Sequence, residues 1–409
     1  MDVVKTAQSP TGAASRLDVT PLVARMGAAR ARSLGFPRAR DIDYSSLAEL
    51  HTGLINNNGD PGTAGRWPAH THDVERDVVA TMSSLFGATP ASRWGYVSGG
   101  GATEGVLHGM WLGRERFPTA RLYYSRAAHY STAKAARLLG MNASVIPTDA
   151  GGAMDLDSLA AAVHAHRDRP ALVVATLGTT MTEALDDIVG IHSVLNAAWI
   201  SDRHIMVDAA LSGLGLAAGG GPTADLLCPD TTLGADSVAM STHKSLGTPH
   251  VGGIVLARRD HVARITRPVD YVDSLDTTIG GSRSGHTAVE VAHALAVIGG
   301  PQQLRARTEN ARTVAAYALD RLRAIGWPAW RHDHAWTVVL DPPPDHVAVR
   351  WAVPISNDAA HIVCPPGVDH ALIDTFVTDL QAADQASNET DYAADHVTDH
   401  AATTLEQQP

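Results

Sequence analysis

Short apolar runs alternate with helical patterns across residues 75–257, and this alternation constrains the fold more than any other feature of the chain. The apolar runs are Arg121 to Ser125, Ser144 to Pro147, Ala171 to Leu177, His204 to Val207, Ser237 to Ser241 and Gly253 to Ala257. The helical patterns are Glu75 to Phe86, Glu104 to Arg114, Ser131 to Leu139, Leu156 to Ala165 and Ile188 to Ala198. Such alternation predicts an α/β fold with a mostly parallel sheet covered by helices on both faces.

The last third of the chain has a different pattern. A helical stretch runs from Ala288 to Ile325 and is interrupted at residues 299–301. We expect strands and a final helix after it, at Ala335 to Leu340, Val347 to Ala352, His361 to Cys364 and His370 to Ala383. The domain prediction is an amino-terminal arm, a large domain, a small α+β domain and a disordered acidic tail. Their ranges are 1–50, with a short helix around 23–33, then 51–287, 288–384 and 385–409.

Two charged residues each follow a predicted strand. Asp208 follows the run Ile205-Met206-Val207, and Lys244 comes 36 positions later, after Met240-Ser241-Thr242-His243. A lysine that forms a Schiff base with a carbonyl cofactor, with a carboxylate that keeps a pyridine nitrogen protonated, is the pair that pyridoxal phosphate chemistry requires. The alternative is a surface lysine and a helix-capping aspartate.

Two further segments favour the cofactor hypothesis. The run Trp94 to Gly105 is a glycine-rich turn that leads into a helical pattern, where free backbone N–H groups favour a phosphate. Such turns are also common without any ligand. His129 follows the predicted strand at Leu122 to Ser125, at the same edge of the predicted sheet. A histidine in that position is either a satisfied polar group or a functional one.

These segments identify a resemblance to the group II pyridoxal-phosphate decarboxylases, most closely to the bacterial histidine decarboxylases of that type. The resemblance extends from about Leu34 to about Leu380, and plant serine decarboxylases are similar to the same branch. The matching segments, in order, are 34–37, 56–60, 94–115, 123–139, 177–180 with 186–188, 207–213, 241–253 and 274–287. The resemblance implies pyridoxal-phosphate fold type I, with a large cofactor-binding domain and a small α+β domain.

The resemblance also implies roles for individual residues. Lys244 would hold the cofactor covalently, Asp208 would pair with the ring nitrogen, and His129 would stack on one ring face; these three are the predicted catalytic residues. Ala210 would contact the other ring face. The remaining predicted cofactor contacts lie on the phosphate side, at Ser98, Gly99, Gly100, Ala102, Thr103, Ser241 and His243. Thr180 and Ser212 would each either contact the cofactor ring or cap a turn. We expect the opposite charge beside Asp208 to lower the pKa of its carboxyl group.

The implied reaction is decarboxylation of an L-amino acid of the histidine type to its amine and carbon dioxide. The alternatives are decarboxylation of serine or another small polar amino acid, decarboxylation-dependent oxidative deamination and transamination. A catalytically silent binding subunit is a further alternative, which Lys244, Asp208 and His129 together disfavour. The family resembled is dimeric with shared active sites. We therefore expect a homodimer in which residues 274–287, with Arg283, reach the neighbouring cofactor pocket; surface pairing of Arg283 is the alternative.

Three segments depart from the family pattern. The turn Ser98 to Thr103 is one residue longer than usual, and Val106 replaces an asparagine. Residues 251–253 read Val-Gly-Gly where the family has Pro-Cys-Gly, and residues 60–66 are glycine-rich where the histidine enzymes carry aromatic residues. The last two are expected near the substrate side chain, so they bear on which amino acid is used.

Composition narrows the class of protein. The chain has 409 residues with 44% hydrophobic content, enough for a large core and two domains. A net charge of −11 without a lysine/arginine cluster argues against nucleic-acid binding. With only two cysteines and neither a signal peptide nor a membrane span in the sequence, we expect a cytoplasmic enzyme. The pairs His70/His72 and His332/His334 have no cysteine neighbours, so we expect no metal site.

Overall fold

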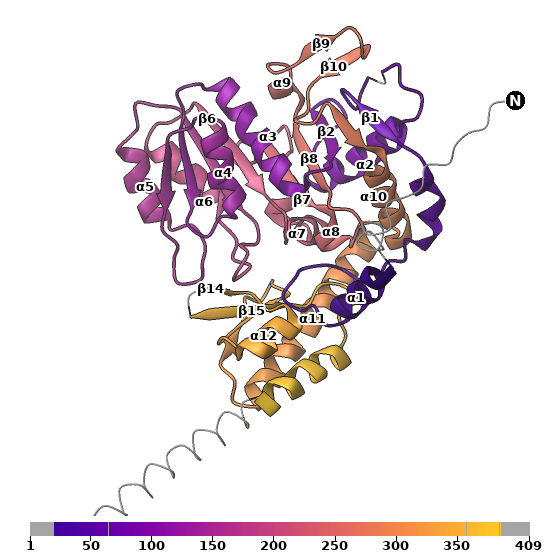
Figure 1. Ribbon diagram of the computed structural model, residues 1–409. Helices are drawn as coiled ribbons and strands as arrows, with labels where there is room; N and C mark the ends of the chain where they lie inside the picture. Colours follow the sequence, from indigo (N-terminus) through magenta and orange to yellow (C-terminus); the bar gives the residue numbers. More distant parts are fainter. Residues whose placement is uncertain (1–19, 64, 357, 384, 386–409) are drawn as a thin grey trace, which may run out of the picture.

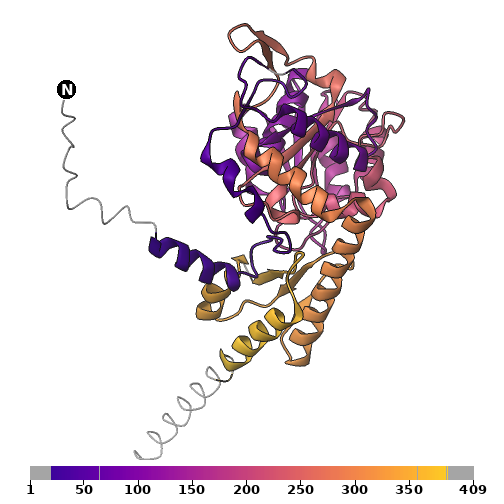
Figure 2. The same ribbon diagram turned by 90° about the vertical axis from the view of Figure 1, so that its right-hand side faces the viewer.

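The computed structural model describes residues 20–383, except 64 and 357, together with residue 385. Figures 1 and 2 show a larger body that contains the main sheet and a smaller body formed by the carboxyl-terminal elements. The long helix α11 (Pro301–Ala324) runs from the larger body along the smaller one. α1 (Thr20–Ala31) has no buried residue and projects away from both.

Seven strands form the main sheet. In spatial order they are β2 (Arg93–Ser98), β8 (Gly253–Arg258), β7 (Ser237–Ser241), β6 (Arg203–Asp208), β5 (Ala171–Thr176), β3 (Arg121–Ser125) and β4 (Ala143–Ile146). The five strands from β7 to β4 are parallel, and only β8 is antiparallel to its neighbours. The predicted α/β fold with a mostly parallel sheet is confirmed.

Helices cover both faces of this sheet, because its strands bury side chains on both sides. In β5, Val173 packs into the cluster beneath α2, α5, α6 and α10, whereas its neighbour Leu172 packs into the cluster beneath α3 and α4. These helices are α2 (His72–Leu85), α3 (Gly101–Arg116), α4 (Tyr130–Leu138), α5 (Leu156–His164), α6 (Ile188–Ala197) and α10 (Gly285–Ile298). Asp155 and Asp187 cap α5 and α6 by accepting hydrogen bonds from the N–H groups of Ser158 and Gly190.

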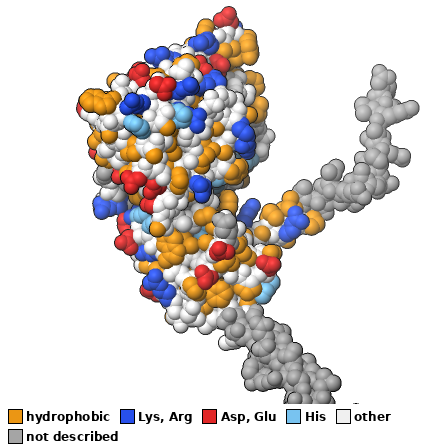
Figure 3. All heavy atoms as spheres, turned by 90° about the vertical axis from the view of Figure 1, so that its left-hand side faces the viewer, with side chains coloured by type: hydrophobic (Ala, Val, Ile, Leu, Met, Phe, Trp, Pro, Cys, Tyr) orange, Lys and Arg blue, Asp and Glu red, His pale blue; other side chains and the backbone are white. Residues whose placement is uncertain are grey.

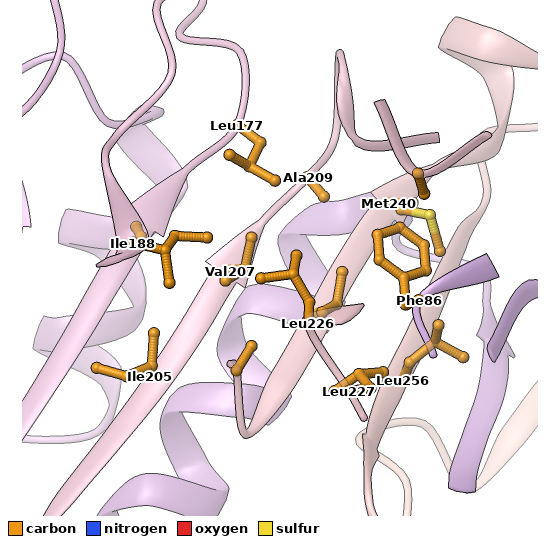
Figure 4. Close-up of a cluster of buried hydrophobic side chains, with 14 of the residues drawn as sticks. Phe86, Leu177, Ile188, Ile205, Val207, Ala209, Leu226, Leu227, Met240 and Leu256 are labelled. Carbon is orange, nitrogen blue, oxygen red and sulfur yellow. The ribbon is translucent and has the colours of Figure 1, made fainter. Parts of the chain in front are cut away.

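Figure 4 shows part of the larger cluster, where Phe86 at the end of α2 lies beside Met240 and Leu256. Phe86 has no exposed surface. Burial of such a side chain stabilises the fold by roughly 1.5–3 kcal/mol. The core thus fixes α2 against the strands that carry the candidate site.

The smaller body has an antiparallel sheet of its own. Its strands in spatial order are β12 (Ala329–Trp330), β13 (Thr337–Leu340), β15 (Ala359–Val363) and β14 (Ile355–Ser356). α11, α12 (Asp345–Trp351) and a helix over residues 370–383 cover it, around a separate cluster that includes Trp351 and Phe376. The predicted domain boundaries stay predictions.

The remaining elements are short. They are η2 (Ser45–Thr52), α7 (Gly213–Gly219), η3 (Gly221–Asp225), α8 (Thr242–Ser245) and α9 (Arg259–Val262), with the strand pairs β1 (Asn56–Asn58)–β11 (Ser282–Ser284) and β9 (Arg267–Val269)–β10 (Ser274–Asp276).

One predicted strand is wrong. Residues 347–352 lie almost entirely in helix α12, not in a strand. The buried side chains are Val347, Ala348 and Trp351, whereas Val349 is 82% exposed. That burial follows helical spacing, because a strand would bury positions 347, 349 and 351 together. The remaining predicted elements agree within a few residues. Residues 1–19 of the arm and the predicted tail, apart from residue 385, lie outside the described residues.

Charged side chains of both signs lie on the surface. On the face shown in Figure 3, acidic and basic side chains are interspersed, so the net negative charge is not concentrated there. In the described part of the chain, every helix is too short or too polar to cross a membrane.

Candidate active site

The register of the main sheet brings several predicted residues to one edge. Asp208 pairs with Thr176 of β5 and with Ala239 of β7, so the carboxyl ends of these parallel strands lie side by side. Gly253 of β8 pairs with both Ser98 and Ser241. The glycine-rich turn after β2 and the lysine segment after β7 therefore flank the same residue.

A glycine is required at position 253. A Cβ atom there would lie 2.4 Å from the carbonyl carbon of Gly101, so any side chain would push the turn away from β8. Gly101 itself has a φ of +65°, a left-handed conformation that favours glycine. These two glycines allow the start of α3 to approach the lysine segment.

A cavity of about 170 Å³ opens at this edge. Its wall contains nine of the predicted site residues, and of the predicted set only Ser98 and Gly99 lie outside it. The nine are Gly100, Ala102, Thr103, His129, Asp208, Ala210, Ser241, His243 and Lys244. The Ser98 hydroxyl donates to the carbonyl oxygen of Gly101 (2.9 Å), so it holds the turn instead.

Other members of the wall come from segments to which the sequence analysis gave no site role. Thr176 ends β5, Gly178 follows it, and Ser131 lies two residues after His129. Phe36 comes from the amino-terminal segment and stacks on His243, with ring centroids 6.0 Å apart and planes at 14°. Thr180 lines the cavity. Ser212 does not, because its hydroxyl donates to Glu183 (2.8 Å).

Burial controls the charges in this cavity. It raises the pKa of Asp208, and the Lys244 ammonium offsets this only in part. Without the cofactor, burial is the larger effect, and the predicted lowering of this pKa by a protonated pyridine ring stays a prediction. Burial also lowers the pKa of Lys244, against the opposing influence of Asp208 and Glu183.

The two histidines of the cavity favour their neutral forms. Burial and the adjacent Lys244 lower the pKa of His243 to about 4, and burial also lowers the pKa of His129. The His129 Nδ1 atom lies 2.7 Å from the Ser131 hydroxyl oxygen, which fixes the ring at the start of α4. A neutral imidazole can present its ring face or a single N–H to a ligand.

The segment around Lys244 is held from two sides. The Ala39 N–H donates to the Lys244 carbonyl oxygen (2.9 Å), and the Tyr44 hydroxyl donates to the Leu246 carbonyl oxygen (2.6 Å). Arg307 of α11 donates to the Ser245 carbonyl oxygen (2.6 Å). The amino-terminal segment and α11 thus position the lysine, which single motifs do not reveal.

Arg283 does not lie on the surface. It is buried in its own chain, where it forms an ion pair with Glu75 and donates to the carbonyl oxygens of Gly59 (3.0 Å) and Val97 (3.2 Å). It also lies over the Tyr96 ring. Surface pairing does not describe Arg283, because these contacts use its guanidinium inside the fold. The predicted reach of residues 274–287 to a neighbouring cofactor pocket stays a prediction.

The chain is similar to known enzymes over most of its length. Residues 116–276 match the family described as "Pyridoxal-dependent decarboxylase conserved domain". The chain is 38% identical over 348 residues to a histidine decarboxylase of Mesorhizobium japonicum, covering 84% of this chain and 91% of that protein. A histidine decarboxylase of Pseudomonas entomophila is also 38% identical, over 86% of this chain and 87% of that protein.

The chain belongs to the pyridoxal-dependent decarboxylases. The predicted family, cofactor and enzyme class are confirmed: it is a pyridoxal-phosphate-dependent amino acid carboxy-lyase. The structure of L-methionine decarboxylase from Streptomyces sp. 590 superposes with a TM-score of 0.82 at 24% identity, covering 92% of this chain and 96% of that chain. Glutamate decarboxylase of Lactobacillus brevis superposes with a TM-score of 0.74 at 17% identity, covering 94% of each chain. These two structures show the shared fold alone.

The cavity of this pyridoxal-dependent decarboxylase fits its cofactor. Among the described residues, His243 Nδ1 and Thr176 Oγ1 are buried atoms without a hydrogen-bond partner, and both residues line the cavity. The N-cap residue of α3, Gly100, has no side chain that could cap the helix, and its own N–H donates to the Glu104 carboxylate (2.9 Å). A lysine for an aldehyde, a carboxylate for a pyridine nitrogen and the start of a helix for a phosphate match the three parts of pyridoxal phosphate.

Proposed function

We propose that this decarboxylase acts on L-histidine and releases the corresponding amine and carbon dioxide. The observation that carries the proposal is the similarity to proteins named histidine decarboxylase from several bacterial genera, at 37–38% identity over 84–86% of the chain. The similarity extends over more of the chain than residues 116–276, which match the family model.

The proposed cofactor-holding residues divide into three groups. Lys244 attaches the cofactor, and Asp208 holds a proton on its ring nitrogen. His129 and Ala210 cover the two ring faces. The phosphate is held by the turn of residues 98–103, in which Gly100, Ala102 and Thr103 line the cavity, Ser98 supports the turn and Gly99 lies outside the wall, with Ser241 and His243 beside it. Bound pyridoxal phosphate supplies an electron-poor ring that accepts the electron pair left when carbon dioxide departs.

The electrostatics of the protein support these roles. Burial lowers the pKa of Lys244, which increases the fraction of neutral amine available as a nucleophile. Burial raises the pKa of Asp208, so this carboxylate is not fully satisfied by Lys244 alone. A protonated ring nitrogen beside Asp208 would supply a further positive partner and keep the carboxylate ionised.

The substrate side chain is proposed to lie toward Phe36 and Val251. Both residues line the cavity and are more than half exposed, at 51% and 60%. They offer apolar surface to a flat imidazole, which favours histidine over serine. The glycine-rich residues 60–66 do not line this cavity within their own chain. Of the two segments that depart from the family pattern and were expected near the substrate, only residues 251–253 reach the cavity, through Val251.

Product analysis tests the substrate. The enzyme would be incubated with a pooled amino acid mixture, and the amines would be identified by mass spectrometry. The expected result is the amine of histidine with stoichiometric carbon dioxide. The amine of serine or another small polar amino acid would overturn the substrate. An aldehyde would indicate decarboxylation-dependent oxidative deamination, and a keto acid would indicate transamination.

We also propose a homodimer with shared active sites. Val251 at the cavity and Tyr130 beside His129 are 60% and 69% exposed, and a second copy would cover this apolar rim. Sedimentation is expected to give a mass about twice the 43.0 kDa of one chain. A fully active monomer would contradict this proposal.

A cytoplasmic location is proposed as well. Cys228 and Cys364 are both free thiols, which suits a reducing compartment. Cell fractionation would test the location; recovery of the enzyme outside the cytoplasm would contradict it.

A further inference from the structure

Three imidazoles and a buried carboxylate meet outside the cofactor cavity. His51 lies near the end of η2, His250 lies in the loop between α8 and β8, and His286 and Glu290 lie on α10. One ligand atom each from His51, His250 and Glu290 lies within 4.8 Å of the other two. The cluster therefore joins three segments that are distant in sequence.

Glu290 is the buried member of this cluster. Its side chain is 1% exposed, and His250 is its only ion-pair partner among the described residues. The His250 ring contacts the Glu290 carboxylate through Nδ1, and the His250 backbone N–H lies 3.4 Å from the same group. A buried carboxylate without a permanent cation is costly, so the fold places a negative group where a cation would be stabilised.

The rings around it are in direct contact. The His51 ring stacks on His286 with centroids 5.2 Å apart and planes at 20°, and its centroid lies 5.2 Å from that of His250. The His286 Nδ1 atom is buried and has no hydrogen-bond partner among the described residues. Three adjacent imidazoles repel one another when protonated, whereas neutral imidazoles are the commonest protein ligands for transition metals.

We propose that His51, His250 and Glu290 bind a divalent transition cation of the Zn²⁺ type. Two imidazole nitrogens and one carboxylate oxygen are a ligand set that such cations accept, with further positions open to water. Ligand atoms of a tetrahedral zinc site lie about 3.3 Å apart, given metal–ligand distances of about 2.0–2.2 Å. To reach that spacing, the exposed His250 ring would move away from the Glu290 oxygen that it now contacts, and the exposed His51 ring would turn toward the ion.

The site would connect the surface to the cofactor cavity through one loop. His250 precedes Val251, which lines the cavity. The Thr248 hydroxyl donates to the His250 carbonyl oxygen (2.9 Å) and lies 2.8 Å from the Thr242 hydroxyl, two residues before Lys244. A cation held by His250 would restrain residues 246–252 and fix them to η2 and α10. The cation is a stabiliser of this loop and takes no part in the reaction.

Zinc binding to the untagged holoenzyme tests the site. Calorimetric titration with Zn²⁺ is expected to show one tight site per chain. His51→Ala and His250→Ala should each weaken it by about tenfold or more, as loss of a ligand requires. His332→Ala is the matched control, since His332 also stacks on a second histidine but belongs to no ligand cluster among the described residues. The control should bind as the parent does.

A structural readout separates a site from adventitious binding. In the parent enzyme, Zn²⁺ should slow hydrogen–deuterium exchange of the peptide over residues 246–252, and in His51→Ala it should not. His51 is exposed, so this variant should fold normally. Equal zinc affinity in the parent, His51→Ala and His250→Ala would overturn the proposal. Binding without protection of the loop would also overturn it.

Discussion

The candidate cavity and the core of the smaller body differ in what they bury. The cavity holds Lys244, Asp208 and His243 at the edge of the main sheet, and burial shifts the pKa of each away from its ordinary value. The core of the smaller body holds apolar side chains such as Trp351 and Phe376, which have no exposed surface. The first arrangement costs stability and provides chemistry, whereas the second provides stability.

One buried carboxylate connects the two regions. Glu183 accepts from the Ser212 hydroxyl (2.8 Å) on the side of the main sheet, and from the N–H groups of Trp336 (3.1 Å) and Thr337 (2.9 Å) of the smaller body. Burial raises the pKa of Glu183 to about 7 despite these donors. Substitutions in the cavity are therefore expected to change the reaction rate, and substitutions in the core of the smaller body are expected to change stability. A substitution of Glu183 is expected to change both.

The largest effect is expected at the lysine. Lys244→Ala should abolish turnover, because among the described residues no other amine lines the cavity. Borohydride trapping of the cofactor on the protein, with a turnover assay, measures this. Lys134→Ala, whose ammonium lies over the Tyr130 ring 5.0 Å from its centroid, is the control. A trapped cofactor in Lys244→Ala would show that the assignment is wrong.

Asp208→Asn is expected to have the next largest effect on rate. The variant preserves shape but removes the charge, so cofactor should still bind while kcat falls by about 10²–10³-fold or more. Steady-state kinetics with a spectrum of the bound cofactor measures both properties. Activity within about tenfold of the parent would contradict the charge-stabilising role.

Phe376→Ala should produce the opposite result. Loss of this buried ring is expected to lower the free energy of unfolding by about 3–5 kcal/mol, without changing kcat of the folded fraction. Denaturant unfolding measures the first quantity, and kinetics at low temperature measures the second. Val349→Ala, at an 82% exposed position of α12, is the control and should be nearly neutral. A lower kcat in folded Phe376→Ala would contradict the separation of rate effects in the cavity from stability effects in the core of the smaller body.

Glu183→Gln should remove a pH dependence of stability. The pKa of this carboxyl is raised from 4.5 to about 7 by folding, so its contribution is fully present below pH 4.5 and is lost as the pH rises through 7. The parent should therefore lose on the order of 3 kcal/mol relative to the variant over this range. Unfolding curves of both proteins at several pH values measure the difference. A constant difference would exclude the raised pKa.

The smallest effect is expected at the mouth of the cavity. Phe36→Ala should raise KM for histidine by roughly tenfold or less, because a ring contact contributes about 0.5–1.5 kcal/mol. The variant should leave kcat close to the parent value. Phe36→Leu keeps an apolar side chain without the flat ring, so it should recover only part of the loss. An unchanged KM in both variants would remove Phe36 from the substrate side.

Local patterns in the sequence decided which features could be predicted. Asp208 and Lys244 could be placed together because parallel strands bring their carboxyl ends to one edge of a sheet. The strand predicted at residues 347–352 was wrong. Valine-rich segments suit a strand by propensity, whereas tertiary burial of Val347, Ala348 and Trp351 selected a helix. The burial of Arg283 against Glu75 was not foreseen, because the two residues are 208 positions apart and no local signal connects them.

The sequence by itself determined the order of the elements, the α/β class, the family and the residues that the cavity gathers, since periodicity and motifs are properties of neighbouring positions. Only the tertiary structure decided that Phe36 joins the wall, that Glu183 links the two bodies, and that burial raises the pKa of Asp208. It also brought His51, His250 and Glu290 together. Burial and long-range contact depend on the packing of the whole chain, and no local segment of sequence contains that information.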